Sequence, residues 1–159
     1  MNTQNTTCMF QIAHILGRTR GMEEQFRHVE RVLTLRNHCI VFVPVVYELD
    51  LYNHNKEVLD AMCYQKLQMC DFCVVLSRDS IGESTLYRII QAHKLGKPVY
   101  VWDMDTDTMT RVNVEKYIQE EMESVKMAVE EYQKRTKATH YIWRDVTPLD
   151  VQEGGKNHE

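Results

Sequence analysis

The chain has 159 residues, of which 43% are hydrophobic and 26% are charged, and its formal net charge is −4. This length suits one domain, which we expect to span residues 1–150, followed by a polar, disordered tail over 151–159. The acidic balance argues against nonspecific nucleic-acid binding, and no apolar run is long enough to cross a membrane. The polar start does not resemble a signal peptide, and five scattered cysteines suit reduced thiols, so we expect a cytoplasmic protein.

Apolar runs alternate with amphipathic stretches in the first part of the chain. Cys8–Leu16 predicts a strand. The apolar run Cys39–Val46 predicts a second strand that is buried on both faces, as in a parallel sheet, and that ends at about Pro44. Between them, Met22–Asn37 carries apolar residues at helical spacing and predicts an amphipathic helix. Tyr47–Asn55 is polar and predicts a loop.

The same alternation continues through the middle of the chain. A second helix is predicted over Val58–Leu67, a buried strand over Phe72–Leu76, a third helix over Ser84–Gly96 and a fourth strand over Val99–Trp102. Strands that alternate with helices predict an α/β protein with a doubly wound parallel sheet. We therefore expect a Rossmann-like or flavodoxin-like three-layer sandwich with four or five parallel strands.

The last third of the chain has a different pattern. Asp103–Thr110 predicts a polar loop, and Val114–Tyr132 predicts a long C-terminal helix of about 20 residues or more. This helix either packs on the sheet or forms a dimer surface. Thr139–Trp143 predicts a short strand at the edge of the sheet.

A strand, a loop and a helix follow one another over residues 71–97. This order places a helix N-terminus at the carboxyl end of a strand, where open α/β sheets bind ligands and where free backbone N–H groups attract anions. Gly82 suits the turn before the helix, and Ser84 and Thr85 suit its N-cap. The two hydroxyl residues have a second interpretation, in which they also contact a phosphate or a sugar hydroxyl.

Four segments in order carry a resemblance to a known family. They include a Gly-Arg-Thr-Arg loop after the first strand and an Ile-Gly-Glu-Ser-Thr motif after the third; the segments are Gly17–Arg20, Leu33–Val41, Lys66–Asp71 and Ile81–Ala92. In this respect the chain resembles the nucleoside 2-deoxyribosyltransferase-like proteins, over about Ile12 to Trp102. The resemblance implies cleavage or transfer of the N-glycosidic bond of a deoxynucleoside or its 5′-phosphate, without a cofactor.

The resemblance fails at the position that matters most for this chemistry. The family places a carboxylate beside the anomeric carbon of the sugar, and Arg88 stands where that glutamate is expected. A guanidinium stays protonated and cannot act as the nucleophile. Glu83 and Asp79 are the candidate catalytic replacements, although both also suit solvated loop charges. The alternative function is a nucleotide-binding module, a sensor or sequestering protein, that has lost the chemistry.

The predicted substrate-binding residues come from the first loop and from the start of the third helix: Gly17, Arg18, Thr19, Arg20, Gly82, Ser84, Thr85 and Arg88. Arg18, Arg20, Arg78 and Arg88 either form a cationic cluster for a phosphate or are unrelated surface arginines. The resemblance further implies a homodimer or a higher homo-oligomer. A third possibility is an assembly protein that uses the long C-terminal helix for contacts.

Other chemistry-bearing residues give weaker signals. Cys70 and Cys73 have the spacing of a redox or zinc motif, but they enter a strand and lack a second pair, so we expect them to pack in the core. Asp71 is expected to fix local loop geometry. The histidines show no metal spacing, and no metal is expected. His14 lies near the end of the first strand, where it either faces a ligand or is buried and hydrogen-bonded.

Overall fold

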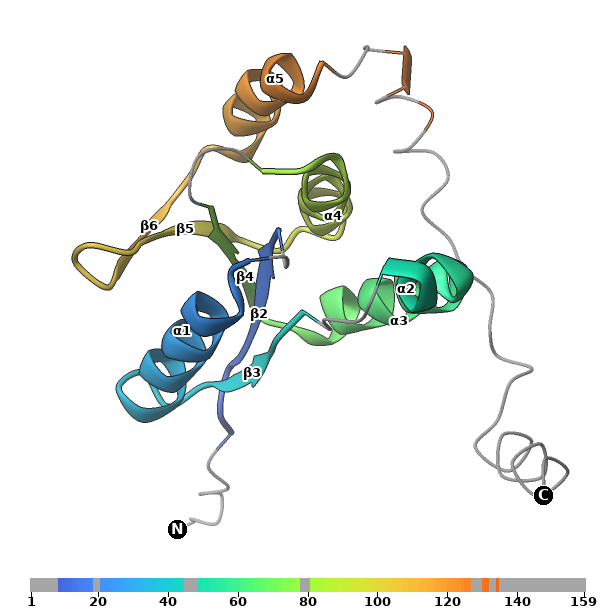
Figure 1. Cartoon of the computed structure of the whole chain (residues 1–159). Coiled ribbons are helices and arrows are strands. Elements are labelled where there is room, and N and C mark those ends of the chain that lie inside the picture. Colours follow the sequence, from blue (N-terminus) through green and yellow to red (C-terminus); the bar gives the residue numbers. More distant parts are fainter. Residues whose placement is uncertain are drawn as a thin grey trace, which may run out of the picture.

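The computed structural model describes residues 9–18, 21–44, 49–77, 81–126, 130–131 and 134. Helices and strands alternate along this part of the chain (Figure 1). In order they are β2 (Ile12–Gly17), α1 (Glu23–Leu35), β3 (Ile40–Phe42), α2 (Leu49–His54), α3 (Lys56–Met69), β4 (Phe72–Leu76), α4 (Glu83–Lys94), β5 (Val99–Asp103), β6 (Thr108–Arg111) and α5 (Val114–Val125).

The strands form one sheet in the order β3-β2-β4-β5-β6. Neighbouring strands from β3 to β5 are parallel, and β6 pairs antiparallel with β5. The sheet reverses its direction of growth at β2, because the chain crosses from β2 to β3 on one side and then returns past β2 to β4. This confirms the α/β class and a mostly parallel sheet, and it is compatible with a Rossmann-like fold.

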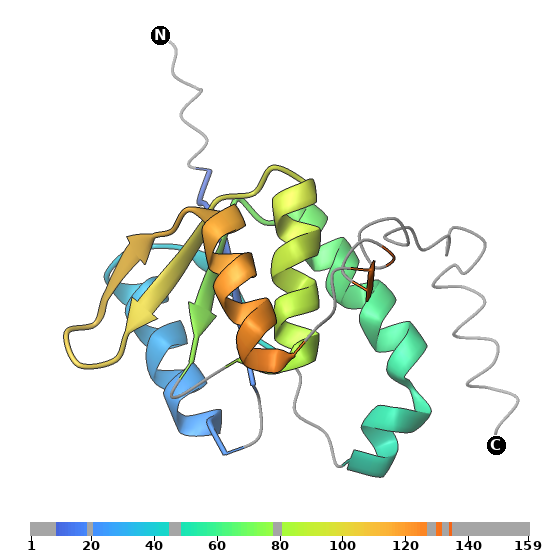
Figure 2. The same cartoon turned by 90° about the horizontal axis from the view of Figure 1, so that it is seen from above.

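Helices cover both faces of the sheet, as Figure 2 shows from above. The amphipathic helix α1 buries Phe26, Val29 and Leu33 against one face. The opposite face carries α3, α4 and α5, which contribute Leu67, Ile89 and other buried residues to a second core. The central strand β4 is buried along its whole length, as its continuous apolar run predicts. The two cores therefore hold the strands rigidly and place their carboxyl ends at one edge.

Two sequence predictions for β3 and the residues that follow it were wrong. The strand covers Ile40–Phe42 and is not buried on both faces: Ile40 is 49% exposed, because β2 is the one strand among the described residues that pairs with β3. The predicted loop over Tyr47–Asn55 contains the short surface helix α2. Its last turn is tied by Asn55, whose side-chain amide donates to the Leu51 carbonyl at 2.9 Å.

The segment Asp103–Thr110, predicted as a loop, instead forms a hairpin with β6. The Asp103 side chain accepts hydrogen bonds from the Asp105 and Thr106 N–H groups, which is the local bonding that favours a turn. Asp107 completes the turn in the left-handed region at φ 54°, which aspartate tolerates better than most residues. The turn brings Thr108–Arg111 back alongside β5.

The long C-terminal helix is not confirmed. Helix α5 has 12 residues, and Lys126 ends it with a left-handed backbone at φ 59°. Its buried residues Ile118 and Met122 pack into the core beside α4, so this part of the helix covers the sheet. The strand predicted over Thr139–Trp143 and the tail over 151–159 lie outside the described residues. No helix in the described ranges combines the length and apolar character needed to span a membrane.

Candidate functional site

A cavity of about 400 Å³ opens at the carboxyl ends of the central strands, where the sheet reverses its direction of growth. Open α/β sheets bind ligands at such a switch point. The wall of the cavity is formed by the end of β2, by Pro44 after β3, by α2 and α3, and by the first turns of α4. The lining residues are His14, Ile15, Leu16, Gly17, Arg18, Pro44, Tyr52, Leu59, Met62, Cys63, Lys66, Gly82, Glu83, Ser84, Thr85 and Arg88.

The fold brings together segments that lie far apart in the sequence. Every predicted site residue that the structure describes lines this cavity: Gly17, Arg18, Gly82, Glu83, Ser84, Thr85 and Arg88. Thr19, Arg20 and Asp79, together with Arg78 of the expected arginine cluster, lie outside the described residues. The cavity is thus the place predicted from the sequence, while the roles of its residues stay predictions.

Gly17 ends β2 where the backbone passes very close to its neighbours. A Cβ atom at this position would lie 2.6 Å from the Leu76 carbonyl oxygen and 3.0 Å from the Phe26 ring. Contacts this short require the backbone of β4 to move. The glycine therefore allows β2 and β4 to pack tightly at the point where the cavity begins.

The N-terminus of α4 forms one wall of the cavity. Its N-cap is Gly82, with extended backbone at φ −85° and ψ 170°, and no side chain caps the helix, so the expected capping by Ser84 or Thr85 was wrong. Ser84 lies in the first turn and is exposed, whereas Thr85 is buried. Because the N-cap residue Gly82 has no side chain that could accept from the first-turn N–H groups, this end of the helix favours an anion in the cavity.

Arg88 is held in the wall of the cavity by an ion pair. Its guanidinium donates to the Asp60 carboxylate of α3 at 2.5 Å, and the two side chains are only 9% and 13% exposed. Lys56 contacts the other oxygen of Asp60 at 3.2 Å. Burial opposes the charge of Arg88, but the neighbouring Cys63 thiol and the Asp60 carboxylate outweigh it and raise the pKa of Arg88. Arg88 therefore remains a cation in the place where the family resemblance implies a carboxylate.

The sequence did not identify Asp60 as part of this arrangement. A buried arginine requires a carboxylate partner, which is a general signal that could have prompted the search. The partner is 28 residues away along the chain, on a different helix, and several carboxylates are available in between. Its spacing of four residues from Lys56 also suits an ordinary surface pair on a helix.

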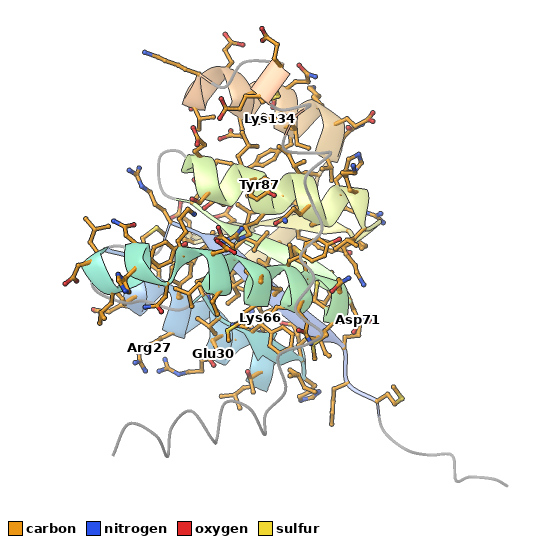
Figure 3. All side chains as sticks on the ribbon, turned by 90° about the vertical axis from the view of Figure 1, so that its right-hand side faces the viewer. Arg27, Glu30, Lys66, Asp71, Tyr87 and Lys134 are labelled. Atoms are coloured by element: carbon orange, nitrogen blue, oxygen red, sulfur yellow. The ribbon has the colours of Figure 1, made fainter. Side chains whose placement is uncertain are left out.

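Lys66 and His14 are two further cavity residues that sequence analysis did not place among the site residues. Lys66 is half-buried on α3, and Figure 3 shows it on the side of the molecule that also carries Tyr87 of α4. His14 lies in the middle of β2 and is 1% exposed. Of its two expected roles, the structure supports burial, but the described residues offer its Nδ1 no hydrogen-bond partner.

The Cys70–Cys73 segment lies at the other end of the sheet from the cavity. Both thiols are buried, with their sulfurs 3.9 Å apart, and Cys70 donates to the Leu67 carbonyl, as expected for residues that pack in the core. Asp71 between them accepts a hydrogen bond from the Ile12 N–H at 2.7 Å, which ties the starts of β2 and β4 together. No group of three or more potential metal ligands occurs among the described residues.

A second hollow lies on the α1 side of the sheet, beside Trp102, Asp103 and Asp105. It has a volume of about 580 Å³, and the described residues that line it include two aspartates but no lysine or arginine. It therefore lacks the cations that distinguish the first cavity.

Comparison with protein families, curated proteins and solved structures found no match for this chain.

Proposed function

We propose that this protein binds a nucleoside 5′-monophosphate, or a closely related phosphorylated nucleoside, in the cavity at the carboxyl ends of β2 and β4. The observation that carries the proposal is that Arg18, Lys66 and Arg88 line the same cavity as the N-terminus of α4, whose N-cap is a glycine. Arginine and lysine side chains and helix N-termini all favour phosphate oxygens. The volume of about 400 Å³ falls within the range of small-molecule sites, about 300–1,000 Å³.

The charges in this cavity favour a protein that binds the nucleotide without cleaving its N-glycosidic bond. Arg88 occupies the place of the expected nucleophile, and a fixed cation there disfavours the oxocarbenium-like sugar that forms as the base leaves. Asp60 is the carboxylate closest to Arg88, but it is already engaged by Arg88 and Lys56. A binding module that senses or sequesters a nucleotide requires neither a free nucleophile nor a general acid.

A second candidate function is cleavage or transfer of the N-glycosidic bond, with Glu83 as the carboxylate. The observation that favours it is the position of Glu83, which lines the cavity at the first turn of α4. Such a reaction needs the carboxylate beside the anomeric carbon and an acid that helps the base depart. This function shares the ligand of the first, so the two differ only in whether bound nucleotide is turned over.

Calorimetry with nucleosides and their 5′-monophosphates tests the proposed ligand. We expect the monophosphate to bind at least about tenfold more tightly than the nucleoside, because charge-assisted hydrogen bonds contribute about 1.5–3 kcal/mol each. Lys66→Met should remove most of this preference. Arg27→Met is the matched control, because Arg27 is exposed on α1, which packs on the opposite face of the sheet, and Arg27 does not line the cavity. Equal affinity for nucleoside and monophosphate would refute the phosphate-binding proposal.

Base release separates the two candidate functions. The protein is incubated with deoxynucleosides and with their monophosphates, and free base is measured by chromatography. We expect tight binding and no free base. Release that disappears in Glu83→Gln but persists in Glu57→Gln, a carboxylate exposed in the first turn of α3, would establish the enzymatic function instead.

We further propose, from the family resemblance, a cytoplasmic homodimer or higher homo-oligomer. Large exposed apolar side chains beside the cavity support an interface there: Leu49, Leu51, Val58 and Met62 on α2 and α3 are 41–55% exposed. Sedimentation velocity at micromolar concentration should show a species of at least twice the chain mass of 18.8 kDa. A single monomeric species would contradict this proposal.

A further inference from the structure

His14 is a polar side chain placed at the floor of the cavity, within a strand that has neighbours on both sides. It sits on β2, opposite Phe42 of β3 and Cys73 of β4 in the parallel register. The Phe42 ring meets the imidazole edge to face, with 5.9 Å between ring centroids. The side chain is almost completely buried, and His14 lines the cavity together with Lys66 and Arg88.

The imidazole has a hydrogen-bonding capacity that the described part of the protein does not use. Its Nδ1 is buried and has no partner among the described residues. A buried polar atom without a partner costs free energy, and such atoms are uncommon in folded proteins. A ligand bound in the cavity could supply the hydrogen-bond partner that the His14 imidazole lacks among the described residues.

The protonation state of His14 determines which type of ligand group it can bind. Burial, followed by the charges of Lys66 and Arg88, lowers the pKa of His14 to about 3. The ring is therefore neutral at physiological pH and carries one donor and one acceptor nitrogen. A phosphate group, which only accepts hydrogen bonds and is negatively charged, is better placed beside Lys66 and Arg88 than beside a neutral ring.

We propose that His14 hydrogen-bonds a sugar hydroxyl of the bound nucleotide and thereby selects ligands that carry this hydroxyl. The inference rests on the proposed nucleotide-binding function. A hydroxyl group both donates and accepts a hydrogen bond, so it is complementary to either tautomer of the neutral imidazole. The cavity then divides into two parts, with the phosphate held by the cations and the α4 N-terminus and the sugar held at the floor by His14.

Calorimetry with matched ligands tests this division. The ligands are the adenosine, guanosine, cytidine and uridine 5′-monophosphates and their 2′,3′-dideoxy analogues, which lack both ring hydroxyls. In the unmodified protein we expect the dideoxy analogue to bind at least about fivefold more weakly, which is the effect of one lost hydrogen bond in a buried site. In His14→Phe, which retains the aromatic ring but not its polar nitrogens, we expect the two ligands to bind equally.

A measurement on the unmodified protein covers the case in which His14→Phe does not fold. In the protein labelled with ¹⁵N-histidine, the ring nitrogens of His14 should shift on addition of the ribonucleotide and remain in place on addition of the dideoxy analogue. Equal affinities for the two ligands together with an unmoved His14 signal would overturn the inference and leave phosphate binding intact. If none of the monophosphates binds, the proposed function and this inference both fall.

Discussion

Replacement of His14 should change how the stability of the protein depends on pH. The His14 pKa is lowered from 6.5 to about 3, first by burial and then by the charges of Lys66 and Arg88. In the unfolded chain the imidazole takes up a proton as the pH falls through 6.5, while in the folded protein it stays neutral down to about pH 3. The unfolded state therefore binds more protons in this window, and the free energy of unfolding falls as the pH falls.

The magnitude follows from the difference between the two pKa values. Each pH unit below 6.5 removes about 1.4 kcal/mol, so His14 alone should lower the free energy of unfolding by about 2 kcal/mol between pH 7 and pH 5. Above pH 6.5 the imidazole is neutral in both states and this dependence disappears. Between pH 5 and pH 3 the loss continues and then levels off, but carboxylates also titrate there, so the upper window gives the cleaner measurement.

The assay is urea denaturation at pH 7.0, 6.0 and 5.0, followed by far-ultraviolet circular dichroism. The His14→Gln variant removes the titrating group and retains a polar side chain, and every other ionisable group is common to the two proteins. We expect the unmodified protein to lose about 2 kcal/mol more than the variant between pH 7 and pH 5. If the two proteins lose equal stability over this range, His14 is not the buried, neutral residue described above.

Three further predictions concern packing, a backbone tie and a buried phenol. Gly17→Ala should lower the free energy of unfolding by about 1–3 kcal/mol, because the added Cβ would lie 2.6 Å from the Leu76 carbonyl oxygen. Chemical denaturation measures this loss of stability. An unchanged free energy of unfolding would show that β4 can move to accept the methyl group. Asp71→Ala should cost about 1–3 kcal/mol in the same assay, since the side-chain acceptor for the Ile12 N–H is lost, and an unchanged midpoint would contradict that role. Burial, followed by the nearby charges of α5, raises the pKa of Tyr117 to about 12. A spectrophotometric titration that compares the protein with Tyr117→Phe should therefore show a phenol that ionises near pH 12, and an ordinary pKa near 10 for Tyr117 would contradict its packing.

Local sequence patterns determined the elements that form this fold. The continuous apolar run Phe72–Leu76 defined a strand that is buried on both faces, and the spacing of Phe26, Val29 and Leu33 defined a helix with one apolar face. Such patterns are local because backbone geometry fixes which side chains share a face. Even the meeting of Gly17 with the start of α4 followed from the sequence, since the carboxyl ends of parallel strands lie at one edge of the sheet.

The position of each strand within the sheet was decided by tertiary contacts. The apolar run Cys39–Val46 suggested a strand buried on both faces, but β3 is a short edge strand, since β2 alone among the described strands pairs with it. In the same way, β6 exists because the turn at Asp107 returns the chain to β5. Composition reports how apolar a segment is, whereas the number of its neighbours depends on the path of the whole chain.

The chemistry of the cavity also depended on the tertiary structure. The family resemblance implies a glutamate at the position of Arg88, but the pairing of Arg88 with Asp60 arises from the way α3 and α4 lie against each other. His14 appeared as one histidine in an apolar strand until the fold buried it near Lys66 and Arg88; burial, and then these two charges, lower its pKa and keep it neutral. Electrostatic interactions act through space between residues distant in the chain, so the residue types were evident from the sequence and their charges and partners only from the packed structure.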